Sequence, residues 1–150
     1  MSYATLDNFK QRLGDDWYAQ LTDRLNRTTA DDDVGQAILD GAHGTINTYL
    51  GKRYRTPIDT TGEPEREEFL RDATLNIAEY KAWSSTPFNT DILERVKGAY
   101  LETRRLLERI ADGKADVPGT STIPSATSAG PSAIVTGDKR IFTEDAMKGL

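Results

Sequence analysis

The sequence contains no cysteine, so it offers no disulfide, no thiolate metal ligand and no cysteine nucleophile. A chain without these groups is typical of a reducing compartment. It has a single histidine, His43, which excludes a site made of several histidine ligands and would have to serve any Ser-His-Asp arrangement alone. Because nothing else in the sequence suggests a pocket around it, we expect His43 to pack or cap within a helix.

Long apolar runs are also absent. Ser2, Tyr3 and Ala4 lead directly into charged sequence, and no stretch is apolar enough for a signal peptide or a membrane span. We therefore expect a protein made in the cytoplasm with no membrane partner. Positive charge is not in excess either, since 19 Lys and Arg against 24 Asp and Glu give a net charge of -5. Any contact with DNA would therefore have to be local.

Large apolar side chains are scarce near the C-terminus. Residues 118–136, "PGTSTIPSATSAGPSAIVT", are mostly small or helix-breaking, and offer too little apolar surface to offset the entropy of ordering them. A length of 150 residues fits one folded domain. We predict a helical connector domain over 1–114, a flexible arm over 115–137 and a docking segment over 138–150.

Before the arm, apolar residues repeat at helical spacing, and no segment shows sustained strand alternation. We therefore predict an all-α protein, a compact bundle of about five helices of which three are long. The expected helices begin after Thr5, run from Asp15 through Leu25, from about Ala30 to Leu50, from Pro64 to before Pro87, and from about Thr90 to Asp112.

The third expected helix has two unusual features. Thr29, followed three residues later by Asp32, matches the pattern of an N-terminal capping box. Gly35, Gly41 and Gly44 lie in the interior, where each glycine costs about 1 kcal/mol relative to alanine. We expect another backbone to approach the helix closely at these glycines.

Two acidic clusters suggest metal binding or acid–base chemistry, namely residues 31–33, "DDD", and residues 65–68, "EREE". Both begin expected helices, where carboxylates stabilise the helix N-terminus, and we favour that role. The stretch from Asp23, "DRLNRTTADDD", lacks the spacing and the sixth-position glycine of a calcium loop. A hydrolase would need paired acids deep in a pocket, so we expect no enzyme, no metal and no cofactor.

The loop after the third helix is basic. Lys52, Arg53 and Arg55 surround Tyr54, which is the composition of a phosphate or nucleic-acid contact. Cations directly after a helix C-terminus also complement its dipole, and we favour this structural role. A loop that faces DNA or a partner is the alternative, and a small helical nucleic-acid-binding protein is the corresponding alternative function.

The final residues again have the features of a structured element. Thr143 can cap a helical turn, Phe142 and Met147 occupy the positions of a hydrophobic staple, and Ile141 and Leu150 extend the apolar side. One helical turn is unstable alone, so this segment needs a surface to dock on. Its own bundle, a neighbouring subunit and a different protein all remain open, because the spacer can span some tens of ångströms.

Four segments in this order resemble the small head–tail connector proteins of Mu-like tailed bacteriophages and prophages: "YATLDNF", "LTDR", "AILDGAHGTINTYLGKRY" and "RIFTEDAMKGL". The resemblance covers most of the chain, including the spacer. One departure is "LNRTTADDD", where relatives carry a turn rich in Asp and Gly, so ion binding suggested for relatives does not carry over.

The resemblance implies a non-enzymatic adaptor in the virion neck, made in the host cytoplasm. It implies a ring homo-oligomer, a dodecamer, that binds the portal protein and a tail-side stopper or tail-completion protein around the genomic DNA. Within that role we expect the docking segment to enter an apolar groove of a neighbouring subunit or of the portal. The segment residues concerned are Lys139, Arg140, Ile141, Phe142, Met147 and Leu150.

Overall fold

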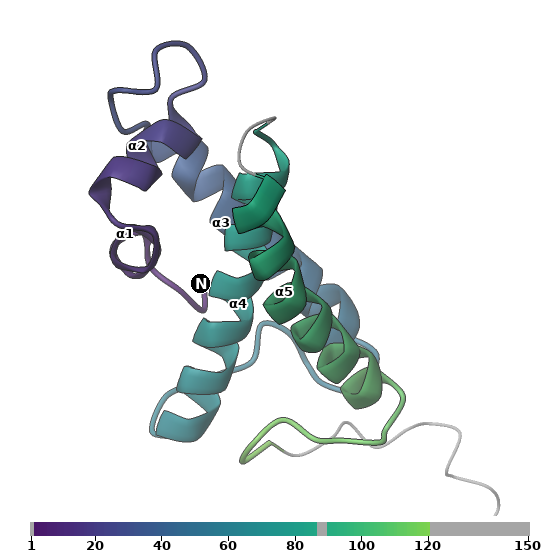
Figure 1. The fold of residues 1–150 in the computed structure, drawn as a ribbon. Coiled ribbons are helices and arrows are strands. Elements are labelled where there is room, and N and C mark those ends of the chain that lie inside the picture. The colour runs from purple at the N-terminus through teal and green to yellow at the C-terminus, as the bar shows by residue number, and fades with distance from the viewer. Residues whose placement is uncertain (1, 87–89, 121–150) are drawn as a thin grey trace, which may run out of the picture.

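The computed structural model describes residues 2–86 and 90–120, and within these ranges the chain forms five α-helices and no strand. The all-α prediction is confirmed. Three long helices pack side by side, and two short helices lie across one side of them (Figure 1). The helices are α1 (Leu6–Leu13), α2 (Asp15–Thr22), α3 (Asp32–Leu50), α4 (Pro64–Ser84) and α5 (Thr90–Ala111).

The first helix begins as the sequence predicts. The backbone N–H of Asn8 donates to the Thr5 hydroxyl at 3.2 Å, and the Thr5 N–H donates to the Asn8 side chain at 3.0 Å, which forms a reciprocal capping box. Phe9 and Leu13 of α1 are buried. Gly14 then adopts a positive φ of 82°, so the chain turns directly into α2.

Helix α2 ends at Thr22, and the prediction that it continues through Leu25 is wrong. The Asp23 carboxylate accepts hydrogen bonds from four backbone N–H groups between Leu25 and Thr29, at 3.0 to 3.2 Å. These amides therefore bond to a side chain instead of continuing the helix. The Leu25 side chain, expected on the apolar face of α2, is 91% exposed on the resulting loop.

The cap of α3 also differs from the prediction. Asp31, and not Thr29, is the N-cap, and its carboxylate accepts from the N–H groups of Asp33 and Val34 at 3.1 and 3.2 Å. The Thr29 N–H donates to Asp23. The carboxylate of Asp31 therefore caps the helix in place of the Thr29 hydroxyl, two residues later than the sequence pattern predicted.

The glycines of α3 have three different surroundings. A Cβ added at Gly35 would lie 2.8 Å from Cζ of Tyr18, and one added at Gly41 would lie 3.2 Å from Nζ of Lys81. A Cβ added at Gly44 would have no described atom within 4 Å apart from its chain neighbours and the backbone of its own helix. The close approaches come from side chains, so the expectation of a neighbouring backbone is wrong.

The core lies between the three long helices. Lys81 links two of them, because its ammonium donates to the Gly41 carbonyl at 2.6 Å and to the Thr45 hydroxyl at 3.1 Å. The aliphatic side chains at the centre are at most 1% exposed, and they are Leu39, Ile46 and Leu50 of α3, Leu70 and Ile77 of α4, and Leu107 and Ile110 of α5.

None of the described helices is long and apolar enough to cross a membrane.

The packed body continues past the end of α5. Gly113 has a φ of 77°, and the chain then runs below the bundle towards the start of α4 (Figure 1). The side chain of Val117 is 1% exposed within this stretch. Contacts with the helices thus extend to Gly119, past the predicted boundary at 114, while residues 121–137 of the predicted arm and the docking segment lie outside the described residues.

Candidate partner-binding surfaces

The basic loop that follows α3 divides into inward and outward side chains. Arg53 is half-buried, and its guanidinium donates to the carbonyls of Ile110 at 3.0 Å and Ala115 at 2.9 Å. The cation therefore neutralises a helix C-terminus, as the sequence suggested, but the helix is α5 and not the preceding α3.

Tyr54 completes this contact. It is 3% exposed, its hydroxyl donates to the Asp116 carboxylate at 3.1 Å, and the Val117 N–H donates to the hydroxyl at 3.2 Å. Asp116 also pairs with Arg53 at 3.0 Å. We call Arg53, Tyr54, Asp116 and Val117 the C-terminal brace, because together they hold the chain after α5 against the end of α3.

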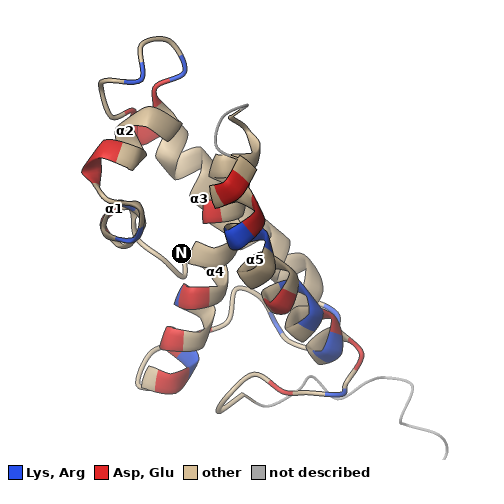
Figure 2. Ribbon diagram, in the orientation of Figure 1, with Lys and Arg blue, Asp and Glu red and all other residues tan. Residues whose placement is uncertain are grey.

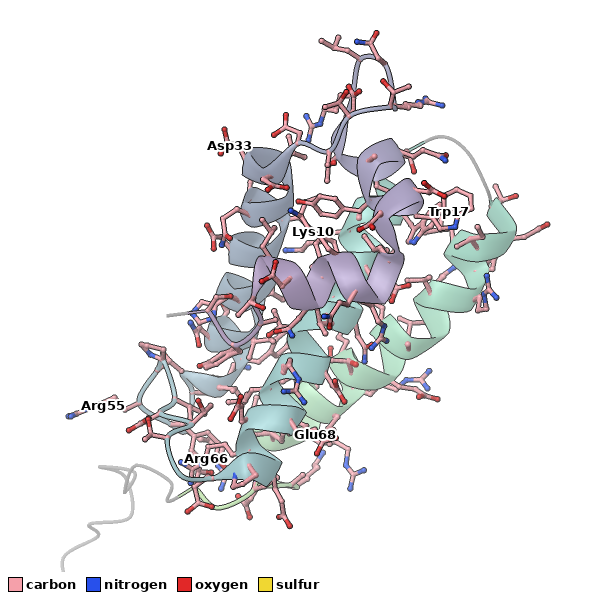
Figure 3. The ribbon with its side chains drawn as sticks, turned by 90° about the vertical axis from the view of Figure 1, so that its left-hand side faces the viewer. Lys10, Trp17, Asp33, Arg55, Arg66 and Glu68 are labelled. Carbon is pink, nitrogen blue, oxygen red and sulfur yellow. The ribbon has the colours of Figure 1, made fainter. Side chains whose placement is uncertain are left out.

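Lys52 and Arg55 are exposed, and Figure 3 shows Arg55 pointing away from the body. Of the four residues predicted as a DNA or partner loop, these two are free to meet another molecule. Arg53 and Tyr54 are engaged in the C-terminal brace.

A second arginine holds the same stretch, and sequence reasoning missed it. Arg66, in the first turn of α4, donates to the Asp59 carbonyl at 2.6 Å, to the Pro118 carbonyl at 3.1 Å and to the Gly119 carbonyl. It lies within the "EREE" cluster, in which the sequence predicted a role only for the carboxylates. Only its bonds to Pro118 and Gly119, more than 50 residues away in sequence, distinguish it from an ordinary surface arginine.

A groove of about 370 Å³ lies between α4 and α5. We call it the α4–α5 groove. Phe69, Ala73 and Leu106 give it an apolar floor, and Asn76, whose amide donates to the Thr103 hydroxyl at 3.0 Å, lines it together with Thr103. Its remaining lining residues are the carboxylates Glu65, Glu68 and Asp72. Figure 2 shows this concentration of acidic residues on the first half of α4.

A second groove, of about 320 Å³, lies where α1 and α2 meet the end of α4 and the start of α5. We call it the tryptophan groove, because the rings of Trp17 and Trp83 contact each other there with centroids 5.1 Å apart. Trp17 is 37% exposed, and the buried Nε1 of Trp83 has no hydrogen-bond partner among the described residues. Arg12, Glu79 and Arg95 also line this groove, and because Arg12 pairs with Glu79 at 3.3 Å, Arg95 supplies its excess positive charge.

The single histidine packs within the structure, as expected. The Ile58 N–H donates to the Tyr3 hydroxyl, which donates to Oδ1 of Asn47, both at 2.8 Å. The amide nitrogen of Asn47 then lies 2.8 Å from Nε2 of His43. This order makes Nε2 an acceptor, so the ring is neutral, and burial lowers the pKa of His43.

The acidic residues at the start of α3 have structural partners. Asp31 caps the helix, and Asp32 pairs with Lys10 at 2.8 Å and accepts from the Tyr18 hydroxyl at 3.1 Å. Burial and the neighbouring Asp32 raise the pKa of Tyr18. In the described ranges, no group of three carboxylates or imidazoles is arranged to hold a metal ion.

Comparison with known families adds the decisive observation. The sequence matches the family described as "Bacteriophage Mu, Gp36" over residues 3–135, which is most of the chain. The chain belongs to this family. It is therefore a Mu-like phage protein. No curated protein matches the sequence. The family match ends before residues 138–150, so the predicted docking segment lies beyond it.

Proposed function

We propose that the protein is a structural component of the phage neck, a head–tail connector that assembles as a ring below the portal. Membership of the Mu Gp36 family carries this proposal, because it supports a role in phage morphogenesis. The compact helical body fits a structural subunit, and neither groove brings together the paired, buried acids of a hydrolytic site. We propose no enzymatic activity. In this role the protein would be made in the host cytoplasm and reside in the virion.

Ring assembly requires two different surfaces on each subunit, because contacts around a ring join unlike patches. The α4–α5 groove is acidic at its rim, whereas the tryptophan groove contains Arg12, which pairs with the lining residue Glu79 at 3.3 Å, and Arg95, which gives this groove a small excess of positive charge. Surfaces of opposite charge with apolar centres suit the two sides of such a contact. This difference supports a head-to-tail ring, for which we retain the dodecamer expected from resemblance.

The other proposed partners are the portal protein, a tail-side stopper or tail-completion protein, and the genomic DNA in the lumen. A net charge of -5 is compatible with DNA that passes without binding tightly. Residues 139–142, together with Met147 and Leu150, remain the segment that we propose to contact the portal or a neighbouring subunit in the assembled neck.

The test is the light-scattering mass of the purified chain alone and mixed with its portal. The truncated variant should end at Thr120, because a chain ending at Gly113 would also lose the buried Val117. A matched control replaces residues 138–150 with a Gly/Ser sequence of equal length. We expect the full chain to join a large complex with the portal. If the full chain stays monomeric with the portal at micromolar concentration, the connector proposal fails.

Exposed Lys52 and Arg55 keep the nucleic-acid-binding alternative testable. A double Lys52→Ala, Arg55→Ala variant should be compared with the unmodified chain in a DNA-binding assay over a range of salt concentrations. Under the connector proposal neither protein binds DNA measurably at physiological salt. Salt-dependent binding that the double variant loses would favour the alternative.

A further inference from the structure

The α4–α5 groove carries uncompensated negative charge. In the described part of the chain, none of Glu65, Glu68 and Asp72 forms an ion pair, whereas seven other pairs are present. Between these carboxylates lies an apolar floor, and Leu106 on that floor is 36% exposed. An apolar strip beside unpaired acids suits a ligand that carries large apolar side chains next to positive charge.

The described chain ends beside the start of α4, the helix that forms one side of this groove. Arg66 holds the carbonyls of Pro118 and Gly119, and a Cβ at Gly119 would lie 2.9 Å from the Glu63 carboxylate. Pro118 and Gly119 therefore lie at the first turn of α4. Glu65 and Glu68 belong to the same part of this helix, and Figure 3 shows Arg66 and Glu68 on opposite sides of it, so a returning segment has to pass around the start of α4 to reach the groove.

The C-terminal sequence has the chemistry that the groove lacks. Lys139 and Arg140 are followed immediately by Ile141 and Phe142, so two cations adjoin two large apolar side chains. Glu144 and Asp145 come only after this group. By helical spacing, exposed Arg109 lies on the same side of α5 as Leu106 and offers these acids a partner.

We propose that, in the free subunit, the α4–α5 groove binds the chain's own segment 138–150. Phe142 lies on the floor formed by Phe69 and Leu106, and Lys139 and Arg140 face Glu68 and Asp72. The roughly 20 residues between Thr120 and Lys139 have a typical span of about 25 Å, which is enough to return to a groove on the adjoining helix. The proposal concerns the isolated subunit and does not depend on ring assembly.

Effective concentration favours the chain's own segment over the segment of a second copy as the ligand of the α4–α5 groove. A short flexible connection gives an effective concentration in the millimolar range, about a thousandfold above a micromolar protein solution. The contact within one chain therefore forms in preference to the contact between two chains, as long as the linker can reach the groove. The described chain ends beside α4, which is within reach. A partner that binds the segment more tightly would then release it and expose the groove.

The absence of cysteine allows a direct test in the full chain. One variant carries Glu65→Cys at the rim together with Thr143→Cys next to Phe142. The matched control carries Leu25→Cys, on the exposed loop before α3, together with the same Thr143→Cys. Both are oxidised at micromolar concentration, and the linked peptides are identified by mass spectrometry. We expect the groove pair to form an intrachain disulfide about tenfold faster than the control pair.

Charge reversal makes the test specific. Lys139→Glu with Arg140→Glu should remove most of the rate advantage of the groove pair, and adding Glu68→Lys with Asp72→Lys should restore it. Circular dichroism checks that each variant keeps its helices. Equal rates for the two cysteine pairs, a disulfide formed mainly between chains, or a rate advantage insensitive to charge reversal would each overturn the proposal.

Discussion

Tyr54 and Asp116 lie 62 residues apart in the sequence, and a 3.1 Å hydrogen bond joins them. The same hydroxyl accepts from the Val117 N–H, and Val117 is almost completely buried. The stretch after α5 is therefore part of the folded body.

Replacing Tyr54 with phenylalanine tests this contact. Tyr54→Phe keeps the buried ring but removes the partner of Asp116 and of the Val117 N–H, so the free energy of unfolding should fall by about 1–2 kcal/mol. Urea denaturation measures the change. Amide exchange at Val117 should also become faster. Arg55→Ala is the control, since it removes an exposed side chain and should stay within about 0.5 kcal/mol of the unmodified chain. Identical effects of both substitutions would argue against the brace.

Two glycines of α3 give opposite predictions for the same substitution. Gly35→Ala should destabilise the protein by about 1–3 kcal/mol, because the new methyl group would force the buried Tyr18 ring away from its place. Gly44→Ala should stabilise it by about 0.5–1 kcal/mol, because the site is open and alanine favours the helix. Thermal unfolding of both variants tests these two predictions. An unchanged melting temperature for Gly35→Ala would contradict the close packing of Tyr18 against Gly35.

The neutral His43 predicts a specific dependence of stability on pH. Its pKa is lowered in the folded protein, so between pH 7 and 5 the unfolded chain takes up the proton first, and stability falls as the pH falls through about 6.5. The variant His43→Gln should have a flatter profile of unfolding free energy over this range. Because His43 is the only histidine, its ring signals in NMR spectra report the folded pKa directly. A folded pKa above 6.5 would refute the donor order inferred from Asn47.

Asp23 predicts an effect at lower pH. Hydrogen bonds from the backbone N–H groups of Asn26, Thr28 and Thr29 lower its pKa from 3.8 to about 2. The carboxylate therefore favours the folded loop fully above pH 4, and this contribution is lost as the pH falls towards 2. NMR titration of the Asp23 carboxyl should give a midpoint near pH 2. The amide signals of Leu25 and Thr28 should move away from their native chemical shifts over the same pH range. A midpoint at or above 3.8 would mean that the loop is not organised by this side chain.

Local signals in the sequence were sufficient for most of the helical framework. Thr5 caps α1, Gly14 separates α1 from α2, Pro64 begins α4 and Gly51 ends α3, as predicted. Thr5 acts through its hydroxyl, Gly14 through its positive φ of 82° and Pro64 through its missing N–H, whereas Gly51 ends α3 with an ordinary φ of -60°. Patterns that operate within one helical turn can be read from the sequence alone.

The errors arise where residues compete or where the partner is distant. Leu25 continued the apolar spacing of α2, but the Asp23 carboxylate takes the amides that the helix needed, and Asp31 displaces Thr29 as the cap of α3. Arg53 and Arg66 bind carbonyls more than 50 residues away, and no local sequence pattern predicts such partners. The candidate surfaces were therefore less predictable than the helices, because grooves form only when separate helices meet.

The two carbonyls held by Arg66 also determine how the protein would bear a mechanical load. Among the bonds that join this stretch to the helices, a pull on the C-terminal end of the chain acts first on those from Arg66 to Pro118 and Gly119, and only afterwards on the Tyr54 contacts and the last turn of α5. Tension is thereby delivered to the first turn of α4 and, through the Asp59 carbonyl, to the loop before it. Helix α5 is spared from unwinding from its end until this anchorage gives way.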